Sequence, residues 1–242
     1  MAITAPPEDF AKKFGLDSIP ESVQRLNQLI NKRDASSEDF AKLITQDKDL
    51  AARLLRAANP RAESEADYTT TTVEAALART GMSAALLLAM SDPLLRAVHK
   101  TFTTMLQIEL KSLLPTMLDP FTTEHVLGEV SFSGKATGLV HLRLPVKFLP
   151  LLGERLLGLA PADMEDSATA NDVIGELCNM IVGNFKSNLC DAGLTCKLNP
   201  PQISRTEAFK LRVVDGGTSQ RYGFRATELD FFADLSVNPW SE

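Results

Sequence analysis

Apolar residues recur at helical spacing through the first third of the chain, and polar or proline-containing stretches separate the segments that carry them. Serine, threonine or proline stands at several of the expected helix starts. The pattern predicts helices within four stretches, 19–33, 36–47, 48–58 and 72–81. Gly81 has the position of a residue that ends a helix. The apolar spacing continues over 82–114, where Pro93 is expected to begin a new helix.

From about residue 120 the period changes, because apolar and polar residues now alternate as they do in half-buried strands. The stretches 124–134 and 136–144 predict a β-hairpin around "SGKATG". A helix is expected within 145–158, and after the acidic turn "PADMEDSA" a long helix runs from about 167 to 190. The rest of the chain predicts antiparallel strands within 194–199, 202–208, 209–215 and 219–237, with "DGGTS" as a hairpin turn.

The order of these elements predicts an α+β protein in two parts. A small all-α bundle is expected at residues 1–92, of which 1–15 form a loose polar lead-in. An α/β domain with an antiparallel sheet and one long helix is expected at residues 93–242. Strands are expected only after about residue 120.

Composition and charge narrow the classes of partner. The hydrophobic share of 44% and the charged share of 23% are those of an ordinary globular chain. The net charge of −6 argues against nucleic acid, because domains that bind it usually carry a basic patch. No apolar run is long enough to cross a bilayer, and the N-terminus lacks the basic start and apolar stretch of a signal peptide. The sequence therefore predicts a cytoplasmic protein without a membrane partner.

The common catalytic and metal-binding motifs are absent. The three cysteines include no CxxC pair, and the three histidines never stand at metal-ligand spacing from a cysteine, so no cofactor or metal of its own is expected. Neither GxSxG nor a Gly-rich phosphate loop occurs. His141 alternates with apolar neighbours and is expected to face solvent from a strand. Cys178 is expected to pack in the core.

The long helix over about 167–190 has two unlike faces when its residues are laid out at 100° intervals. The side expected to face the core is apolar and consists of Ile174, Leu177, Cys178, Ile181 and Phe185. The narrow strip opposite is polar or small and consists of Asp172, Glu176, Asn179, Gly183 and Ser187. Gly175 borders this strip, although a glycine inside a helix costs roughly 1 kcal/mol relative to alanine. The strip is either an ordinary solvated face or a surface that another molecule approaches closely.

The segment "DVIGELCNMIVGNFKSNL" resembles the signature helix of the CheC/CheX family of chemotaxis phosphatases. That signature has an aspartate or serine, then a glutamate and an asparagine, which Asp172, Glu176 and Asn179 match. A proline follows a little over twenty residues later, and Pro201 stands about one residue short of that spacing. The segments "TFTTMLQIEL" and "GEVSFSGKATGLVHLRLP" are similar to the family's first helix and first hairpin, so the resemblance covers roughly 95–240. One such motif is present, as in CheX, whereas CheC carries two.

The resemblance implies a CheX-like phosphatase that acts on the aspartyl-phosphate of a CheY-like receiver domain. It implies that Asn179 holds the attacking water and that Glu176 pairs with a lysine of the receiver. Asp172, Gly175 and Gly183 are expected at the rim that the receiver contacts, and the receiver is expected to supply Mg²⁺. The alternative is a non-catalytic adaptor that binds a receiver or another signalling partner.

The N-terminal part resembles an HDOD domain, a helical signalling module of bacteria, over about 16–92. It is shorter than that family's usual length and has Asn59-Pro60 where Asn-Ser is common. HDOD domains carry no metal-binding His-Asp pair, and no histidine precedes His99 here. The resemblance implies a non-catalytic interaction module, while a plain helical extension that braces the second domain is the alternative. Whether the chain forms a homodimer is left open by the sequence.

Overall fold

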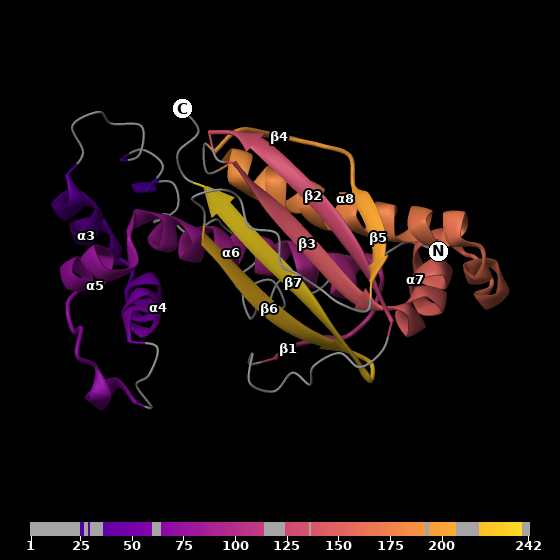
Figure 1. Cartoon of the computed structure of the whole chain (residues 1–242), viewed down its shortest axis with the longest axis horizontal. Coiled ribbons are helices and arrows are strands. Elements are labelled where there is room, and N and C mark those ends of the chain that lie inside the picture. Colours follow the sequence, from indigo (N-terminus) through magenta and orange to yellow (C-terminus); the bar gives the residue numbers. More distant parts are fainter. Residues whose placement is uncertain are drawn as a thin grey trace.

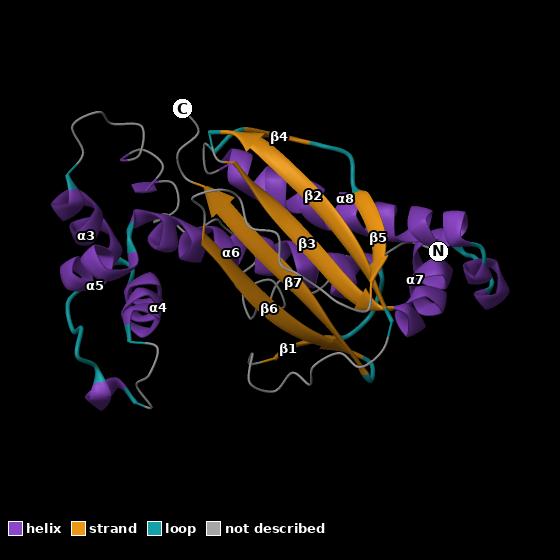
Figure 2. Ribbon diagram, in the orientation of Figure 1, coloured by secondary structure: helices purple, strands orange, loops and turns teal. Residues whose placement is uncertain are grey.

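A helical bundle lies at one end of an antiparallel sheet, and two long helices run along one face of that sheet (Figure 1). The computed structural model describes residues 25–26, 29, 36–59, 64–113, 124–135, 137–191, 194–206 and 218–238. Helices dominate the first part of this described chain and strands the second, so the predicted α+β class is confirmed (Figure 2). None of the helices in the described ranges is long and apolar enough to span a membrane.

The bundle helices begin where capping side chains were expected. They are α3 (Ser37–Gln46), α4 (Lys48–Ala58) and α5 (Val73–Thr80), with the short 3₁₀ turn η1 (Glu65–Asp67) before α5. Ser36 and Asp39 form a capping box at α3, and the Thr72 side chain accepts a hydrogen bond from the Ala75 N–H at α5. Gly81 ends α5 with φ +84°, as its position predicts. The expected helix 19–33 lies mostly outside the described residues.

Helix α6 (Met82–Lys100) is continuous through Pro93, so the prediction of a new helix at that proline is wrong. Pro93 has no N–H to donate to the carbonyl of Ala89, and α6 nevertheless continues past it. Its own carbonyl accepts a hydrogen bond from Asn188 Nδ2 at 3.2 Å. The first half of α6 contacts α4 and α5, and the rest packs on the sheet and on α8 (Ser167–Asp191). The predicted domain division at residue 92 therefore falls inside a shared helix.

The helix expected up to residue 114 ends early. A π-helical turn, η2 (Thr101–Met105), follows α6, and Gln107 then takes a left-handed backbone with φ 56°. Strand β1 (Leu110–Leu113) comes next and pairs with β6 (Thr218–Ala226), so a strand appears before residue 120, contrary to expectation. Pairing with a distant strand overrides the local helical pattern here.

The sheet has the order β1-β6-β7-β3-β2, and β4 and β5 both pair with the remaining edge of β2. The predicted hairpin is confirmed as β2 (His125–Gly134) and β3 (Thr137–Pro145), with Val130 opposite Val140. The other strands are β4 (Cys196–Leu198), β5 (Gln202–Thr206) and β7 (Leu229–Asn238). The expected strand 219–237 is two strands that turn at 227–228, while the strand 209–215 and most of "DGGTS" lie outside the described residues.

The stretch between the hairpin and α8 is helical, as expected. It holds the 3₁₀ turn η4 (Val146–Phe148), helix α7 (Leu149–Leu157) and the 3₁₀ turn η5 (Pro161–Glu165) in place of the acidic turn. Gly158 ends α7 with φ 67°. This stretch brings the chain to the face of the sheet that α6 and α8 cover, where α7 and η5 both contact α8.

Helix α8 lies against β2 at one close point. A Cβ added to Gly128 would come within 2.3 Å of Cys178 Sγ and 3.3 Å of Ile174 Cγ2. Any larger residue at this position of β2 would push the helix away. Farther along the sheet, Phe102 stacks on Phe231 with ring centroids 4.7 Å apart. One part of the core is therefore the layer between the sheet and the helices α6 and α8, and it continues into the bundle of α3, α4 and α5.

The opposite face of the sheet is lined with buried polar side chains. His141 is 1% exposed and its Nε2 lies 2.8 Å from Glu129 Oε2, so the expectation that it faces solvent is wrong. Asp234 on the next strand is fully buried and forms a two-pronged ion pair with Arg221 at 2.7 and 3.0 Å. Alternation places His141 on the face away from the helices, where its Nε2 meets Glu129 rather than water.

The packing of α8 predicts how the cysteines react. Burial raises the pKa of Cys178 to about 12, and the side chain is fully inaccessible, whereas Cys190 is half-buried. At pH 8 we expect a thiol reagent to label Cys190 in the native protein and to reach Cys178 only after unfolding. A Cys190→Ser variant assigns the fast phase. Labelling of Cys178 as fast as Cys190 would show that the helix faces are assigned wrongly.

Candidate functional site

The two faces of α8 lie as the helical layout predicts. Ile174, Leu177, Cys178, Ile181 and Phe185 are all 0% exposed and face the sheet. On the opposite side Asp172, Glu176 and Asn179 are exposed, and Gly175 and Gly183 are half-buried. The prediction that Cys178 is a packing residue is confirmed, because it lies fully buried on the inner face. The polar strip is thus presented outward.

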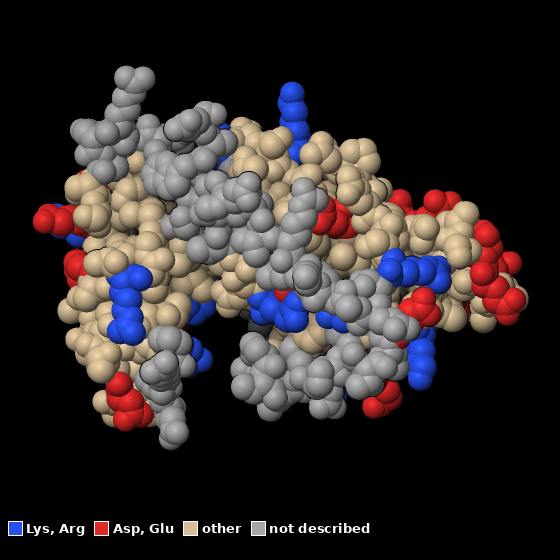
Figure 3. Space-filling view, viewed as in Figure 1, with Lys and Arg blue, Asp and Glu red and all other residues tan. Residues whose placement is uncertain are grey.

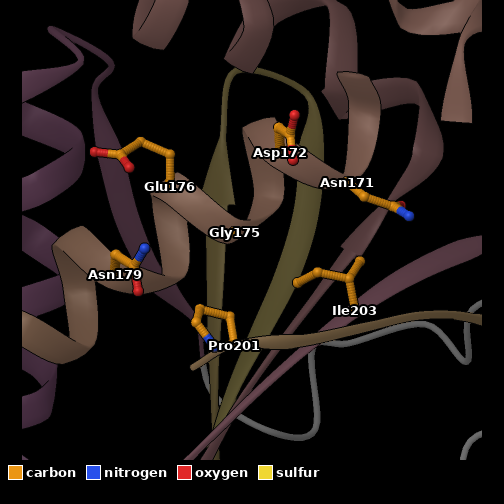
Figure 4. Close-up of a pocket in the computed structure, with 7 residues that line it drawn as sticks. All are labelled: Asn171, Asp172, Gly175, Glu176, Asn179, Pro201 and Ile203. Carbon is orange, nitrogen blue, oxygen red and sulfur yellow. The ribbon is translucent and has the colours of Figure 1, made fainter. Parts of the chain in front are cut away.

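The strip borders an open groove of about 510 Å³ between α8 and the connection from β4 to β5. Its lining residues are Asn171, Asp172, Gly175, Glu176, Asn179, Pro201 and Ile203 (Figure 4). Four of the five predicted site residues, Asp172, Gly175, Glu176 and Asn179, meet here. The fifth, Gly183, lies one helical turn beyond Asn179 and outside the groove.

The second wall of the groove is fixed by the edge of the sheet. Because β4 and β5 pair with the two ends of β2, the short connection between them must follow that strand. Asn199 anchors it, since its N–H donates to Ser131 O at 2.9 Å and its Nδ2 to Ser131 Oγ at 2.7 Å. Two residues later Pro201 is held against the polar side of α8, across from Gly175 (Figure 4).

The glycines of α8 are not required by the packing of this chain. A Cβ added to Gly175 or to Gly183 would meet no atom of the rest of the chain within 4 Å. Gly128, by contrast, is needed to let α8 approach the sheet. Each of these glycines therefore lowers the stability of the helix by roughly 1 kcal/mol relative to alanine, and no packing contact within the chain requires it. What the glycines do provide is room beside Asn179 and Glu176.

The approach to the groove is acidic. Asp163, Glu165 and Asp166 stand exposed just before α8, and Figure 3 shows acidic atoms gathered at this end of the molecule. The Asp166 carboxylate accepts hydrogen bonds from Thr169 Oγ1 at 2.6 Å and from Thr169 N–H at 2.8 Å. These bonds lower the pKa of Asp166 and keep it charged. With Asp172 and Glu176, the surface favours a positively charged partner group.

The described residues offer no resident metal site, because no three histidine, cysteine, aspartate or glutamate side chains in these ranges cluster at ligand distance. The side chains of Glu176 and Asn179, at the centre of the groove, are also without a hydrogen-bond or ion-pair partner in the described structure. An amide that can donate and accept thus stands beside a carboxylate at an open groove, with both free to meet an outside molecule.

Two lining residues, Asn171 and Ile203, were not predicted. Asn171 precedes Asp172 by one residue and Gly175 by one turn, so the helical layout could have found it at the edge of the strip. Its Oδ1 is buried and has no hydrogen-bond partner within the described ranges. Ile203 depends on the pairing of β5 with β2, where it stands opposite Gly128, and no local pattern reveals that register.

Two family models match the chain. The model for the chemotaxis phosphatase CheX matches residues 126–225, and the model for the HDOD domain matches residues 16–116. The HDOD match runs past the predicted limit at residue 92 and includes all of α6. No curated protein matches the sequence.

Several solved structures share the fold. The chemotaxis protein CheX from Vibrio vulnificus is 19% identical with a TM-score of 0.53, over 62% of this chain and 96% of that one. A CheX from Desulfovibrio desulfuricans is 18% identical with a TM-score of 0.51, over 62% of this chain and 99% of that one. The CheX–CheY–BeF3–Mg²⁺ complex from Borrelia burgdorferi is 20% identical with a TM-score of 0.50, over 62% of this chain and 97% of that one. The first part of the chain is therefore similar to HDOD domains, and the part that holds the sheet is similar to CheX in sequence pattern and in fold.

Proposed function

We propose that this protein hydrolyses the aspartyl-phosphate of a CheY-like receiver domain. The observation that carries the proposal is the groove, where Glu176 and Asn179 project side by side from α8 next to a glycine that leaves room for a docked surface. The fold supports it, since a CheX of this fold has been crystallised with CheY, BeF3 and Mg²⁺. The proposal includes a cytoplasmic location for the chain, as the sequence predicts.

In the proposed reaction a water oxygen attacks phosphorus while the bond from phosphorus to the receiver's carboxylate oxygen breaks. The products are inorganic phosphate and a free aspartate. The receiver would supply Mg²⁺, and this chain would supply the geometry of attack. Asn179 suits that task because its amide oxygen accepts from the water while its Nδ2 donates to a phosphoryl oxygen. No general base is needed from this chain.

Glu176 is assigned to docking. Its carboxylate is exposed, lies three residues before Asn179 and adds to the acidic approach. A lysine beside the phosphorylated aspartate of the receiver would meet this charge as Asn179 reaches the phosphoryl group. Asp172 lies one turn nearer the helix start and would contribute at the rim, with a smaller effect on affinity.

The proposal is tested by phosphate release from receivers phosphorylated with a small-molecule phosphodonor. Full-length protein at a concentration well below that of the receiver should speed hydrolysis over many turnovers. Binding measured in parallel separates the two functions. A parent protein that binds the phosphorylated receiver and never speeds its hydrolysis would establish the adaptor alternative instead.

Asn179→Ala should abolish most of the acceleration. Removing one group that orients the reacting atoms typically costs about 10²–10³ in rate. Affinity for the phosphorylated receiver should change little, because the amide acts on the water in the transition state. Asn179 is exposed, so the free energy of unfolding should stay within about 0.5 kcal/mol of the parent value. Hydrolysis as fast as the parent's would refute the role given to Asn179.

Glu176→Gln should weaken receiver binding, by about tenfold at low salt, because it removes the charge but keeps the shape. The loss should shrink as salt is added, since exposed charges are screened. The matched control is Glu74→Gln, an exposed glutamate on α5 with the same change in net charge. Titrations of both variants against phosphorylated receiver at two salt concentrations make the comparison. Equal affinities of the two variants would contradict the docking role.

A further inference from the structure

Met105 is one of two large apolar side chains that the described ranges leave strongly exposed. It is 48% exposed, and so is Leu157 at the end of α7. Met105 lies beside α8, where Asn184 Nδ2 is 3.9 Å from its sulfur and also donates to Met180 O at 2.9 Å. Single exposed apolar residues are common, so the way this one becomes exposed decides whether it matters.

The π-helical turn is what moves Met105 to the surface. In α6 the buried positions Leu94, Val98 and Phe102 follow helical spacing, and a regular α-helix would place residue 105 on the same face. In η2 the hydrogen bond instead runs from the Leu106 N–H to Thr101 O at 3.0 Å, which widens the turn by one residue. As a result Leu106 is buried at 2% exposure in the place that Met105 would have taken.

Gln107, two residues after Met105, has a second unusual conformation. Gln107 is exposed and has a left-handed backbone at φ 56°, which residues with a Cβ adopt at a cost. Together, the π turn and Gln107 reverse the chain into β1 while holding Met105 outward beside α8. Single π turns and strained residues of this kind occur frequently at functional sites.

The position of Met105 ties it to the groove. Gly183 is four residues beyond Asn179, about 6 Å along the helix axis, and Asn184, which contacts Met105, follows it. Met180 directly follows Asn179, and its carbonyl accepts a hydrogen bond from Asn184, which also contacts Met105. We call Met105, Met180 and Gly183 the Met105 patch. Gly183 carries no side chain to cover it, and the patch has no charged member.

A domain docked at the groove would extend beyond it along α8. Specific interfaces bury about 800 Å² on each partner, which is more than the seven residues of the groove can supply. The acidic side chains lie before the start of α8, whereas the Met105 patch lies farther along the helix and adds uncharged, apolar area to the surface that a partner would meet. Methionine suits the centre of such a contact because its flexible thioether adapts to the surface it meets.

We propose that Met105 is the apolar anchor of the receiver-docking surface. The inference rests on the proposed function and adds a feature of the partner, an apolar patch beside its phosphorylated aspartate. Met105 takes no part in the attack on phosphorus. It contributes to affinity through contact area alone.

The test compares Met105→Lys and Met105→Ala with Leu157→Lys, a substitution at the same exposure on α7. Binding of full-length protein to phosphorylated receiver is measured by titration, and the hydrolysis rate is measured at saturating receiver. We expect Met105→Lys to weaken binding about tenfold or more and Met105→Ala to weaken it less. Leu157→Lys should bind like the parent. The rate at saturation should stay within about twofold for all three.

Parent-like affinity of Met105→Lys, or an equal loss in Leu157→Lys, would overturn the anchor and leave the proposed function intact. A lower saturated rate in Met105→Lys with unchanged affinity would also overturn it, because the residue would then act on the chemistry. Failure of the parent itself to bind any receiver would overturn the proposed function and the anchor together.

Discussion

The close contact between Gly128 of β2 and Cys178 of α8 sets the orientation on which the candidate site depends. With no side chain at Gly128, the helix lies directly on the strand, and Cys178 and Ile174 fill the contact. Once Cys178 faces the sheet, Asn179 lies about 100° and Glu176 about 160° around the helix axis from it. Both side chains must then face away from the sheet. The site is therefore a consequence of how one strand residue lets one helix approach.

Helix α6 connects this site to the rest of the structure. It packs beside α8 on the sheet, where Asn188 donates to the Pro93 carbonyl, and it also belongs to the bundle, where Arg53 of α4 donates to Leu88 O at 3.2 Å. The same helix then continues into η2 and so places Met105 beside α8. The bundle, the sheet and the surface around the groove are thus connected through one element.

The sequence predicts the parts of this structure in which local spacing and packing agree. The inner face of α8, with Cys178 between Ile174 and Ile181, follows from its period alone, and so does the hairpin of β2 and β3. Prediction fails where contacts with residues distant in the sequence determine the structure. Residues 110–113 keep a helical pattern but pair with β6, and His141 alternates like a solvent-facing residue but is buried against Glu129.

The site was predicted in the same uneven way. Its helical half follows from the strip on α8, whereas Pro201 was suggested only by a family resemblance and Ile203 by nothing local, because strand register brings them to the groove. Met105 shows the limit most clearly. A regular α-helix would bury it, and a single widened turn exposes it instead.

The central claim is that α8 keeps Gly175 for a partner and not for its own packing. The most direct test measures the free energy of unfolding and receiver turnover together for Gly175→Ala and Gly175→Leu. Alanine should leave stability unchanged or raise it by up to about 1 kcal/mol, because its Cβ meets open space. Turnover should fall with alanine and fall further with leucine as the groove fills. Variants that are at least as stable as the parent and equally active would contradict the account.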